Sequence, residues 1–162
     1  MCTLEKRGNL FILTLIGDEE HCLDPTLIAT ILSTLSQVKA QVTRGSVLIT
    51  ISHKKFFSNG FDLPWAQVVG SKEGAAKRLH YMVESLKLMV GAFLSLPMPT
   101  ISAVTGHAAA AGLMIALSHD YVFIRRDKGV LYMSEIDIGL TLPDYFTALV
   151  TTRISSASAR RE

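Results

Sequence analysis

The sequence contains little cysteine, and its cysteines lack the spacing of a metal site. Cys2 and Cys22 are the two cysteines among 162 residues, and no Cys-x-x-Cys pair or Cys/His ligand pattern occurs. This excludes a disulfide scaffold and a structural zinc site of the common type. Such low cysteine use is typical of proteins from a reducing compartment.

The sequence also lacks long hydrophobic runs and a strong charge bias. Gly, Pro, Ser or His interrupts each apolar stretch before it reaches the roughly 20 residues that a membrane span requires. No basic segment followed by an apolar one marks a secretory signal at the N-terminus. The formal net charge is +2, which does not indicate a nucleic-acid partner. With 49% hydrophobic and 19% charged residues, the composition predicts a globular domain with a sizeable core.

Hydrophobic periodicity predicts an α/β order of strands and helices. Asp24 before Pro25 fits an N-cap followed by a first helical residue, and the apolar residues behind them recur at helical spacing. Pro97 and Pro99 end a second, longer helix. The predicted strands cover residues 2–6, 10–15, 46–51, 100–104, 121–125 and 130–133. The predicted helices cover residues 25–40, 73–96, 113–118 and 143–150.

One domain is expected to hold nearly all of these elements. No linker or low-complexity tract divides residues 1–154, which we predict to be the core domain. Residues 155–162 are Ser-Ser-Ala-Ser-Ala-Arg-Arg-Glu, which fits a helix cap and first helical turns. We therefore expect them to begin a truncated C-terminal helical region, in a truncated or alternatively spliced product.

Two segments place small residues where a strand passes into a loop or helix. In residues 56–63, Gly60 permits a positive φ, and a turn there can point the Asn59 amide into a cleft; an ordinary Asn-Gly turn is the alternative. In residues 106–112, small residues before a helix let the backbone approach a ligand and leave helix N–H groups facing outward. A tight contact between helix and sheet is the alternative there.

The two segments together resemble those of a known family. Phe-Ser-x-Gly-x-Asp-Leu at 57–63, Gly-x-Ala-x-Ala-Ala-Gly at 106–112 and Ser-His-Asp-Tyr at 118–121 resemble the crotonase (enoyl-CoA hydratase/isomerase) superfamily. Leu-Glu-Lys-Arg-Gly-Asn-Leu-Phe at 4–11 and Leu-Pro-Met-Pro-Thr-Ile at 96–101 are similar to the plant peroxisomal Δ3,Δ2-enoyl-CoA isomerases. The resemblance covers nearly the whole chain. It implies an α/β fold, a crotonase-like spiral of ββα units with sheets covered by helices.

The resemblance also implies a substrate, an assembly and a location. The substrate would be a fatty acyl-CoA thioester, with no separate cofactor because coenzyme A is part of the substrate. Full-length members would form a homotrimer or a dimer of trimers, with no nucleic acid and no membrane span. The location would be the peroxisome, although this chain ends without a C-terminal targeting signal; a truncated product would be cytoplasmic.

Two backbone amides carry the expected chemistry. The resemblance implies that the N–H groups of Asn59 and Ala111 bind the thioester oxygen, which requires both to converge on a point about 3 Å from each. Two such donors stabilise an enolate by roughly 3 kcal/mol or more each. Asp62 is expected to accept a hydrogen bond within its own turn. The implied substrate-binding residues are Ser58, Asn59, Gly60, Phe61, Asp62, Leu63 and Ala111.

Glu135 is the expected base. The resemblance implies that it moves a proton from carbon 2 to carbon 4, converting 3-enoyl-CoA to trans-2-enoyl-CoA in the β-oxidation of unsaturated fatty acids. Asp137 and Asp144 are alternatives, and a capping or ion-pairing role for Glu135 is the simpler hypothesis. An apolar wall would raise the pKa of the base. The candidates for that wall are Leu113, Met114, Leu140 and Leu142.

Other functions remain as alternatives. A hydratase of this family needs a second glutamate where this chain has Met114, so hydration is not the main hypothesis. A catalytically silent acyl-CoA-binding or assembly subunit is the alternative from another class. Lys54 and Lys55 either contact CoA phosphates or lie on a solvated loop. His119 and Asp120 fit a helix terminus better than a hydrolase triad, because no Gly-x-Ser-x-Gly elbow occurs.

Overall fold

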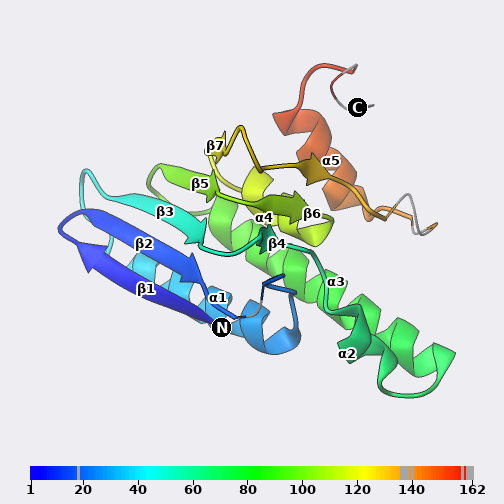
Figure 1. Cartoon of the computed structure of the whole chain (residues 1–162). Helices are drawn as coiled ribbons and strands as arrows, with labels where there is room; N and C mark the ends of the chain where they lie inside the picture. The colour runs from blue at the N-terminus through cyan, green and yellow to red at the C-terminus, as the bar shows by residue number, and fades with distance from the viewer. Residues whose placement is uncertain (18, 136–138, 140, 158, 160–162) are drawn as a thin grey trace.

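Two sheets form the framework of the chain. The computed structural model describes residues 1–17, 19–135, 139, 141–157 and 159, and Figure 1 shows the arrangement. The larger sheet has the order β1-β2-β3-β5-β7, with β1 antiparallel to β2 and the other pairs parallel. Its strands are β1 (Cys2–Arg7), β2 (Leu10–Leu15), β3 (Val47–Ser52), β5 (Thr100–Val104) and β7 (Tyr121–Ile124). The smaller, parallel sheet contains β4 (Phe56–Ser58), β6 (His107–Ala109) and β8 (Leu131–Tyr132).

The strands follow the alternation of apolar residues. In β2, Phe11, Leu13 and Leu15 are buried while the residues between them are partly exposed, so one face of the strand packs on the core. Gly8 has φ +61°, which allows the tight turn between β1 and β2. The predicted strands are confirmed to within one or two residues. β4 and β6 were not predicted, since three residues are too few for a periodic signal.

Five helices connect and cover the strands in the described part of the chain. They are α1 (Pro25–Ala40), α2 (Leu63–Gln67), α3 (Lys72–Leu94), α4 (Ala111–Leu117) and α5 (Asp144–Arg153). The carboxylate of Asp24 accepts the N–H of Leu27 at 2.6 Å, which confirms the predicted N-cap of α1. α1 packs beside α3, and α5 lies at the far end of the molecule from the β1–β2 hairpin (Figure 1). The α/β architecture with helix-covered sheets is thus confirmed.

α4 is the central helix, because it contacts both sheets as well as α3 and α5. All seven of its residues are buried, so it has no polar face. A Cβ atom on Gly112 would collide with the Ser58 carbonyl, which means that α4 lies directly against the end of β4. The smaller sheet and α4 therefore hold the two glycine motifs in contact.

The C-terminal residues do not form the expected helix where the structure describes them. Residues 155–157 and 159 are coil or turn. The Ser156 hydroxyl accepts the N–H of Ala159 at 3.4 Å, a contact of the type that caps a helix. The division between residues 1–154 and 155–162 stays a prediction. Within the described ranges, no helix has both the length and the apolar character that a membrane crossing requires.

Candidate active site

The two glycine motifs meet at one point. Gly60 has φ +87°, and a Cβ atom added to it would lie 2.8 Å from the Ala110 Cβ and 3.3 Å from the Ala111 nitrogen. The residue at this position therefore has to lack a side chain. This close approach places the backbone N–H groups of Phe61 and Ala111 near each other, just beyond the ends of β4 and β6.

The amide of Asn59 is already engaged within the fold. Its backbone N–H donates to the Glu20 carbonyl at 2.8 Å, and its side-chain amide donates to the Glu20 carboxylate at 3.2 Å. A backbone N–H that is spent in this way cannot also bind a substrate oxygen. The prediction that Asn59 supplies the first oxyanion donor is therefore wrong.

The amide of Phe61 is in a different situation. Leu23 forms a parallel β-bridge with Phe61 through the two residues that flank Phe61. The Leu23 N–H donates to the Gly60 carbonyl at 2.7 Å, and the Asp62 N–H donates to the Leu23 carbonyl at 3.0 Å. This parallel bridge leaves the Phe61 N–H on the side away from Leu23. Among the described residues, it donates no hydrogen bond.

Ala111 supplies the second open amide. It is the first residue of α4, where a helix N–H has no intrahelical acceptor. Ala110 before it has φ +51°, which turns the chain sharply between β6 and the helix. The Ala111 N–H has no recorded acceptor within the described part of the chain. The structure thus brings together two unengaged amides, those of Phe61 and Ala111.

A cavity of about 320 Å³ opens beside these residues. It is lined by Asn59, Phe61, Leu63, Ala76, Leu79, His80, Val83, Ala110, Ser134, Glu135, Thr141, Pro143 and Phe146. Three of the seven predicted substrate-binding residues, Asn59, Phe61 and Leu63, are in this lining. The Ser58 hydroxyl instead donates to the His21 carbonyl, and the Asp62 carboxylate accepts the Trp65 N–H at 2.9 Å as the cap of α2. The expected structural role of Asp62 is confirmed.

Glu135 is the carboxylate that lines the cavity among the described residues. It is 8% exposed, and its Oε2 atom has no hydrogen-bond partner in the described part of the chain. Burial raises the pKa of Glu135 because the charged form loses its hydration. Asp144 is exposed in the first turn of α5 and outside the lining. Asp137 lies outside the described residues.

The apolar wall differs from the predicted one. Leu113 and Met114 are buried in the core, Leu142 packs partly buried against it, and none of these three lines the cavity. Leu140 lies outside the described residues. The wall instead comes from α3, through Ala76, Leu79, His80 and Val83 at helical spacing. The apolar stripe of this helix was visible in the sequence, but the face that meets Glu135 was not.

Tyr145 joins α5 to α3 beside the cavity. Its hydroxyl donates to the Val83 carbonyl at 2.9 Å, and burial raises the pKa of the tyrosine above its usual range. Its ring meets Phe146, a lining residue, edge to face with centroids 4.9 Å apart. The contact fixes the start of α5 against the helix that forms the apolar wall.

The His119–Asp120 pair has a structural role, as expected. The Asp120 carboxylate accepts both the N–H and the hydroxyl of Thr100 at 2.9 Å, which joins the end of α4 to the start of β5. His119 is fully buried and bonds Thr50 and the Ile115 carbonyl, each at 2.8 Å. Neither residue lines the cavity.

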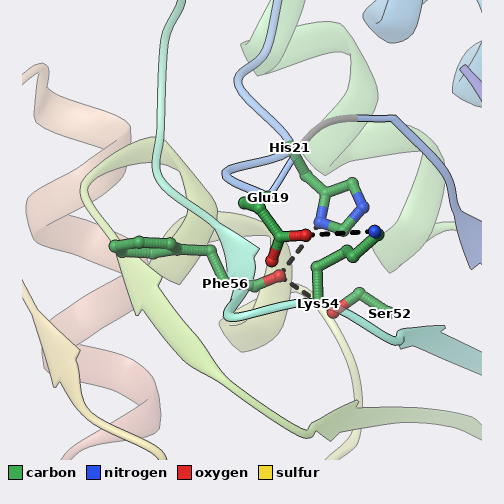
Figure 2. Close-up of polar contacts among 5 residues, drawn as sticks. All are labelled: Glu19, His21, Ser52, Lys54 and Phe56. Atoms are coloured by element: carbon green, nitrogen blue, oxygen red, sulfur yellow. Dashed lines mark hydrogen bonds and ion pairs between the residues drawn. The ribbon is translucent and has the colours of Figure 1, made fainter.

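Polar contacts fix the loop that leads into β4 (Figure 2). Lys54 pairs with Glu19 at 3.1 Å, and the Phe56 carbonyl is bonded by His21 Nδ1 at 2.9 Å and by the Ser52 hydroxyl at 3.0 Å. Where the structure describes the chain, no group of three or more His, Cys, Asp or Glu side chains is placed to hold a metal ion. Glu19 and His21 therefore serve the loop that leads into the first motif.

Comparisons with known proteins agree with this fold. The family model for enoyl-CoA hydratase/isomerase matches residues 7–161. Among solved structures, DspI of Pseudomonas aeruginosa matches 99% of this chain and 59% of its own, with a TM-score of 0.84 and 22% identity. An enoyl-CoA hydratase of Bacillus anthracis matches 99% of this chain and 60% of its own, with a TM-score of 0.84 and 18% identity.

Curated relatives give a finer match. The chain is 69% identical to enoyl-CoA delta isomerase 2, peroxisomal, of Arabidopsis thaliana, over all of this chain and 68% of the relative. It is 51% identical to enoyl-CoA delta isomerase 1, peroxisomal, of the same plant, over 65% of that protein. The chain thus spans about two thirds of the length of these isomerases. On the matches of sequence and fold together, the chain belongs to the enoyl-CoA hydratase/isomerase family.

Proposed function

We propose that this chain isomerises 3-enoyl-CoA to trans-2-enoyl-CoA in the β-oxidation of unsaturated fatty acids. The observation that carries the proposal is a buried carboxylate, Glu135, in an apolar cavity that Phe61 and Ala110 also line. Two unengaged backbone amides adjoin that cavity. Sequence identity of 51% to 69% to proteins named enoyl-CoA delta isomerase supports the same reaction.

The amides of Phe61 and Ala111 would bind the thioester oxygen. Removal of a proton from carbon 2 moves the electron pair of the C–H bond toward that oxygen, which becomes an enolate oxygen. Fixed N–H donors stabilise the developing charge without reorganising, by roughly 3 kcal/mol for each donor. Because Gly60 lies against Ala110 and Ala111, the fold sets the spacing of the two donors before substrate arrives.

Glu135 would move the proton. Its carboxylate takes the proton from carbon 2, the conjugated enolate spreads the charge to carbon 4, and Glu135 returns the proton there. The C3–C4 double bond becomes a C2–C3 double bond, so no atom is gained or lost. The Oε2 atom, which has no partner among the described residues, is available to accept the proton, and burial raises the pKa of Glu135, which favours the protonated form of the carboxylate.

Hydration is less well supported than isomerisation. A hydratase of this family would use a second glutamate at the position of Met114, and that side chain is fully buried in the core and outside the cavity lining. A thioether can neither take up nor deliver a proton to water. One carboxylate that shuttles a proton is sufficient for the isomerase reaction.

Location and assembly follow from the relatives rather than from the site. Two of the isomerases that resemble this chain are named peroxisomal, and we extend that location to this protein. A trimer or a dimer of trimers is proposed as the assembly on the resemblance to full-length members of the family. Coenzyme A would enter as part of the substrate, with no separate cofactor.

A two-substrate assay tests the proposal. The purified chain is incubated with a 3-enoyl-CoA, and isomerisation is followed as a rise in the ultraviolet absorbance, because the product is conjugated. In a separate assay it is incubated with a trans-2-enoyl-CoA, and hydration is followed as a fall in that absorbance. We expect isomerisation without hydration, and the same from Glu84→Gln, which changes an exposed carboxylate on α3. Hydration without isomerisation would overturn the proposal. Saturable acyl-CoA binding without turnover would favour the catalytically silent binding subunit.

A further inference from the structure

A second open cavity, of about 480 Å³, lies at the other end of β4 and β6. The cavity of the candidate active site, lined by Glu135 and Phe61 among others, is called the acyl cavity below. It begins at Asn59 and Ala110, just after these strands end, whereas the second cavity begins at Lys55 and Gly106, just before they start. We call it the basic groove. It is lined by His53, Lys54, Lys55, Thr105, Gly106, His107, Arg125 and Lys128.

Among the described residues, the lining of the basic groove contains four permanent cations and no carboxylate. Glu19 pairs with Lys54 at 3.1 Å, and Asp127 holds Arg125 through two contacts at 2.7 and 2.9 Å. The groove therefore keeps two positive charges after its ion pairs are counted, as large an excess as the net charge of +2 on the whole chain. In the described structure, neither Lys55 nor Lys128 has an ion-pair partner.

Three turns form the walls of the basic groove, and hydrogen bonds hold them in register. The His107 N–H donates to the Lys55 carbonyl at 3.0 Å, and the Thr105 hydroxyl donates to the Ser52 carbonyl at 2.5 Å. The Arg125 N–H donates to the carbonyl of Val104 at 3.0 Å. The cations thus stand on a fixed backbone and need not be gathered by the ligand, which lowers the entropic cost of binding.

Close packing and a ring contact fix this wall of the groove. A Cβ on Gly106 would collide with the Lys55 carbonyl, so the two turns contact each other here through main chain alone. Lys55 Nζ lies 5.6 Å from the centroid of the Phe56 ring, which packs on His107 with centroids 5.1 Å apart. This contact favours one orientation of the lysine.

We propose that the basic groove binds a diphosphate group, separately from the acyl cavity. Lys55 and Lys128, which have no ion-pair partner in the described structure, stand on different turns, at 53–55 and 125–128, so a ligand that contacts both needs negative charge at two points. A diphosphate meets that requirement and pairs with ammonium groups as point charges. The volume lies in the range of small-ligand sites. The proposal is independent of the isomerase function, because the groove shares no lining residue with the acyl cavity.

Calorimetric titration with inorganic diphosphate, without any CoA ester, tests the proposal. We expect saturable binding that weakens as salt rises. Lys55→Gln combined with Lys128→Gln should weaken it roughly tenfold, as expected for two charge contacts in water. Lys39→Gln combined with Lys72→Gln removes the same charge from exposed positions outside the groove and should weaken it less than twofold. Arginine at positions 55 and 128 should restore binding.

The effect of the glutamine pair on the KM for a 3-enoyl-CoA shows whether the diphosphate belongs to coenzyme A or to a free phosphoanion. If the glutamine pair also raises the KM for a 3-enoyl-CoA at constant kcat, the diphosphate bridge of coenzyme A occupies the groove. If KM is unchanged while diphosphate binding is lost, the ligand is a free phosphoanion. Absence of saturable binding, or equal losses in the two lysine pairs, would overturn the proposal.

Discussion

Two buried titratable side chains of this molecule differ in how their polar atoms are satisfied. His119 is fully buried, and both of its ring nitrogens have partners, Thr50 and the Ile115 carbonyl. Glu135 is 8% exposed, and its Oε2 atom has no partner among the described residues. Glu135 lines a cavity, whereas the His119 ring packs against Phe93 at a tilt of 44°, with ring centroids 4.5 Å apart.

The difference bears on which of the two groups has capacity for a substrate. The Ile115 carbonyl can only accept, so Nδ1 of His119 carries the hydrogen and Nε2 accepts the hydroxyl hydrogen of Thr50. Burial lowers the pKa of His119 to about 4, which keeps this neutral form near pH 7. With its bonds complete, His119 has no capacity left for a substrate. Within the described structure Glu135 keeps an acceptor unused, and burial raises its pKa because the charged form loses its hydration.

The largest effect should come from Glu135→Gln, which removes the exchangeable proton and preserves the shape of the side chain. We expect the isomerisation rate to fall by about 10²- to 10⁴-fold, the contribution of a positioned base. The absorbance assay with 3-enoyl-CoA measures it, with Glu84→Gln as the matched control on the surface. Turnover that survives in Glu135→Gln would transfer the role to another carboxylate and weaken the comparison with His119.

A pH effect on stability should follow for His119. Its pKa is about 4 in the folded chain and 6.5 in the reference state, so the unfolded chain binds more protons between these values. The free energy of unfolding should therefore fall as the pH drops through this window, by about 3 kcal/mol in all. Urea unfolding at pH 7 and pH 4 measures the fall. His119→Gln, which does not titrate, should flatten it; an equally steep fall in the variant would place the effect elsewhere.

Thr50→Val tests whether completed hydrogen bonds are what make His119 structural. The substitution conserves volume but leaves Nε2 buried without a donor, at a cost of about 1–3 kcal/mol in the free energy of unfolding. Thr151→Val is the control, since its hydroxyl bonds a carbonyl of its own helix at an exposed position, and about 0.5 kcal/mol or less is expected. Urea unfolding compares the two. Equal losses would mean that the hydroxyl of Thr50 contributes little.

Local patterns in the sequence were sufficient for the regular elements. The bounds of α1, β2 and β5 were predicted to the residue, because each has a clear apolar period and a flanking turn or cap. α2 was not predicted, because a helix of five residues is too short to show a helical period. The motif pair and Glu135 were also found from the sequence.

The donor pair could not be assigned from the sequence in the same way. The choice between Asn59 and Phe61 depends on the carbonyl of Glu20, which lies 39 positions earlier and occupies the Asn59 N–H. Local spacing does not encode such a contact. The partner of His119 is likewise 69 positions away, at Thr50. The sequence therefore indicated the segments that line the cavity, while long-range hydrogen bonds determine which of their N–H groups remain available.

The smallest effect, and the opposite in sign to that of His119, should appear in the stability of Glu135→Gln. Burial raises the folded pKa of Glu135, so the folded chain holds this proton to a higher pH than the unfolded chain does. The stability that Glu135 contributes is present below its unfolded pKa and is lost as the pH rises through its folded pKa. Glutamine stays neutral and does not lose it. The variant should match the wild type near pH 4 and exceed it in urea unfolding at pH 7. A variant that is less stable than the wild type only at pH 7 would mean that the ionised carboxylate is satisfied within the fold, which would remove the distinction between Glu135 and His119.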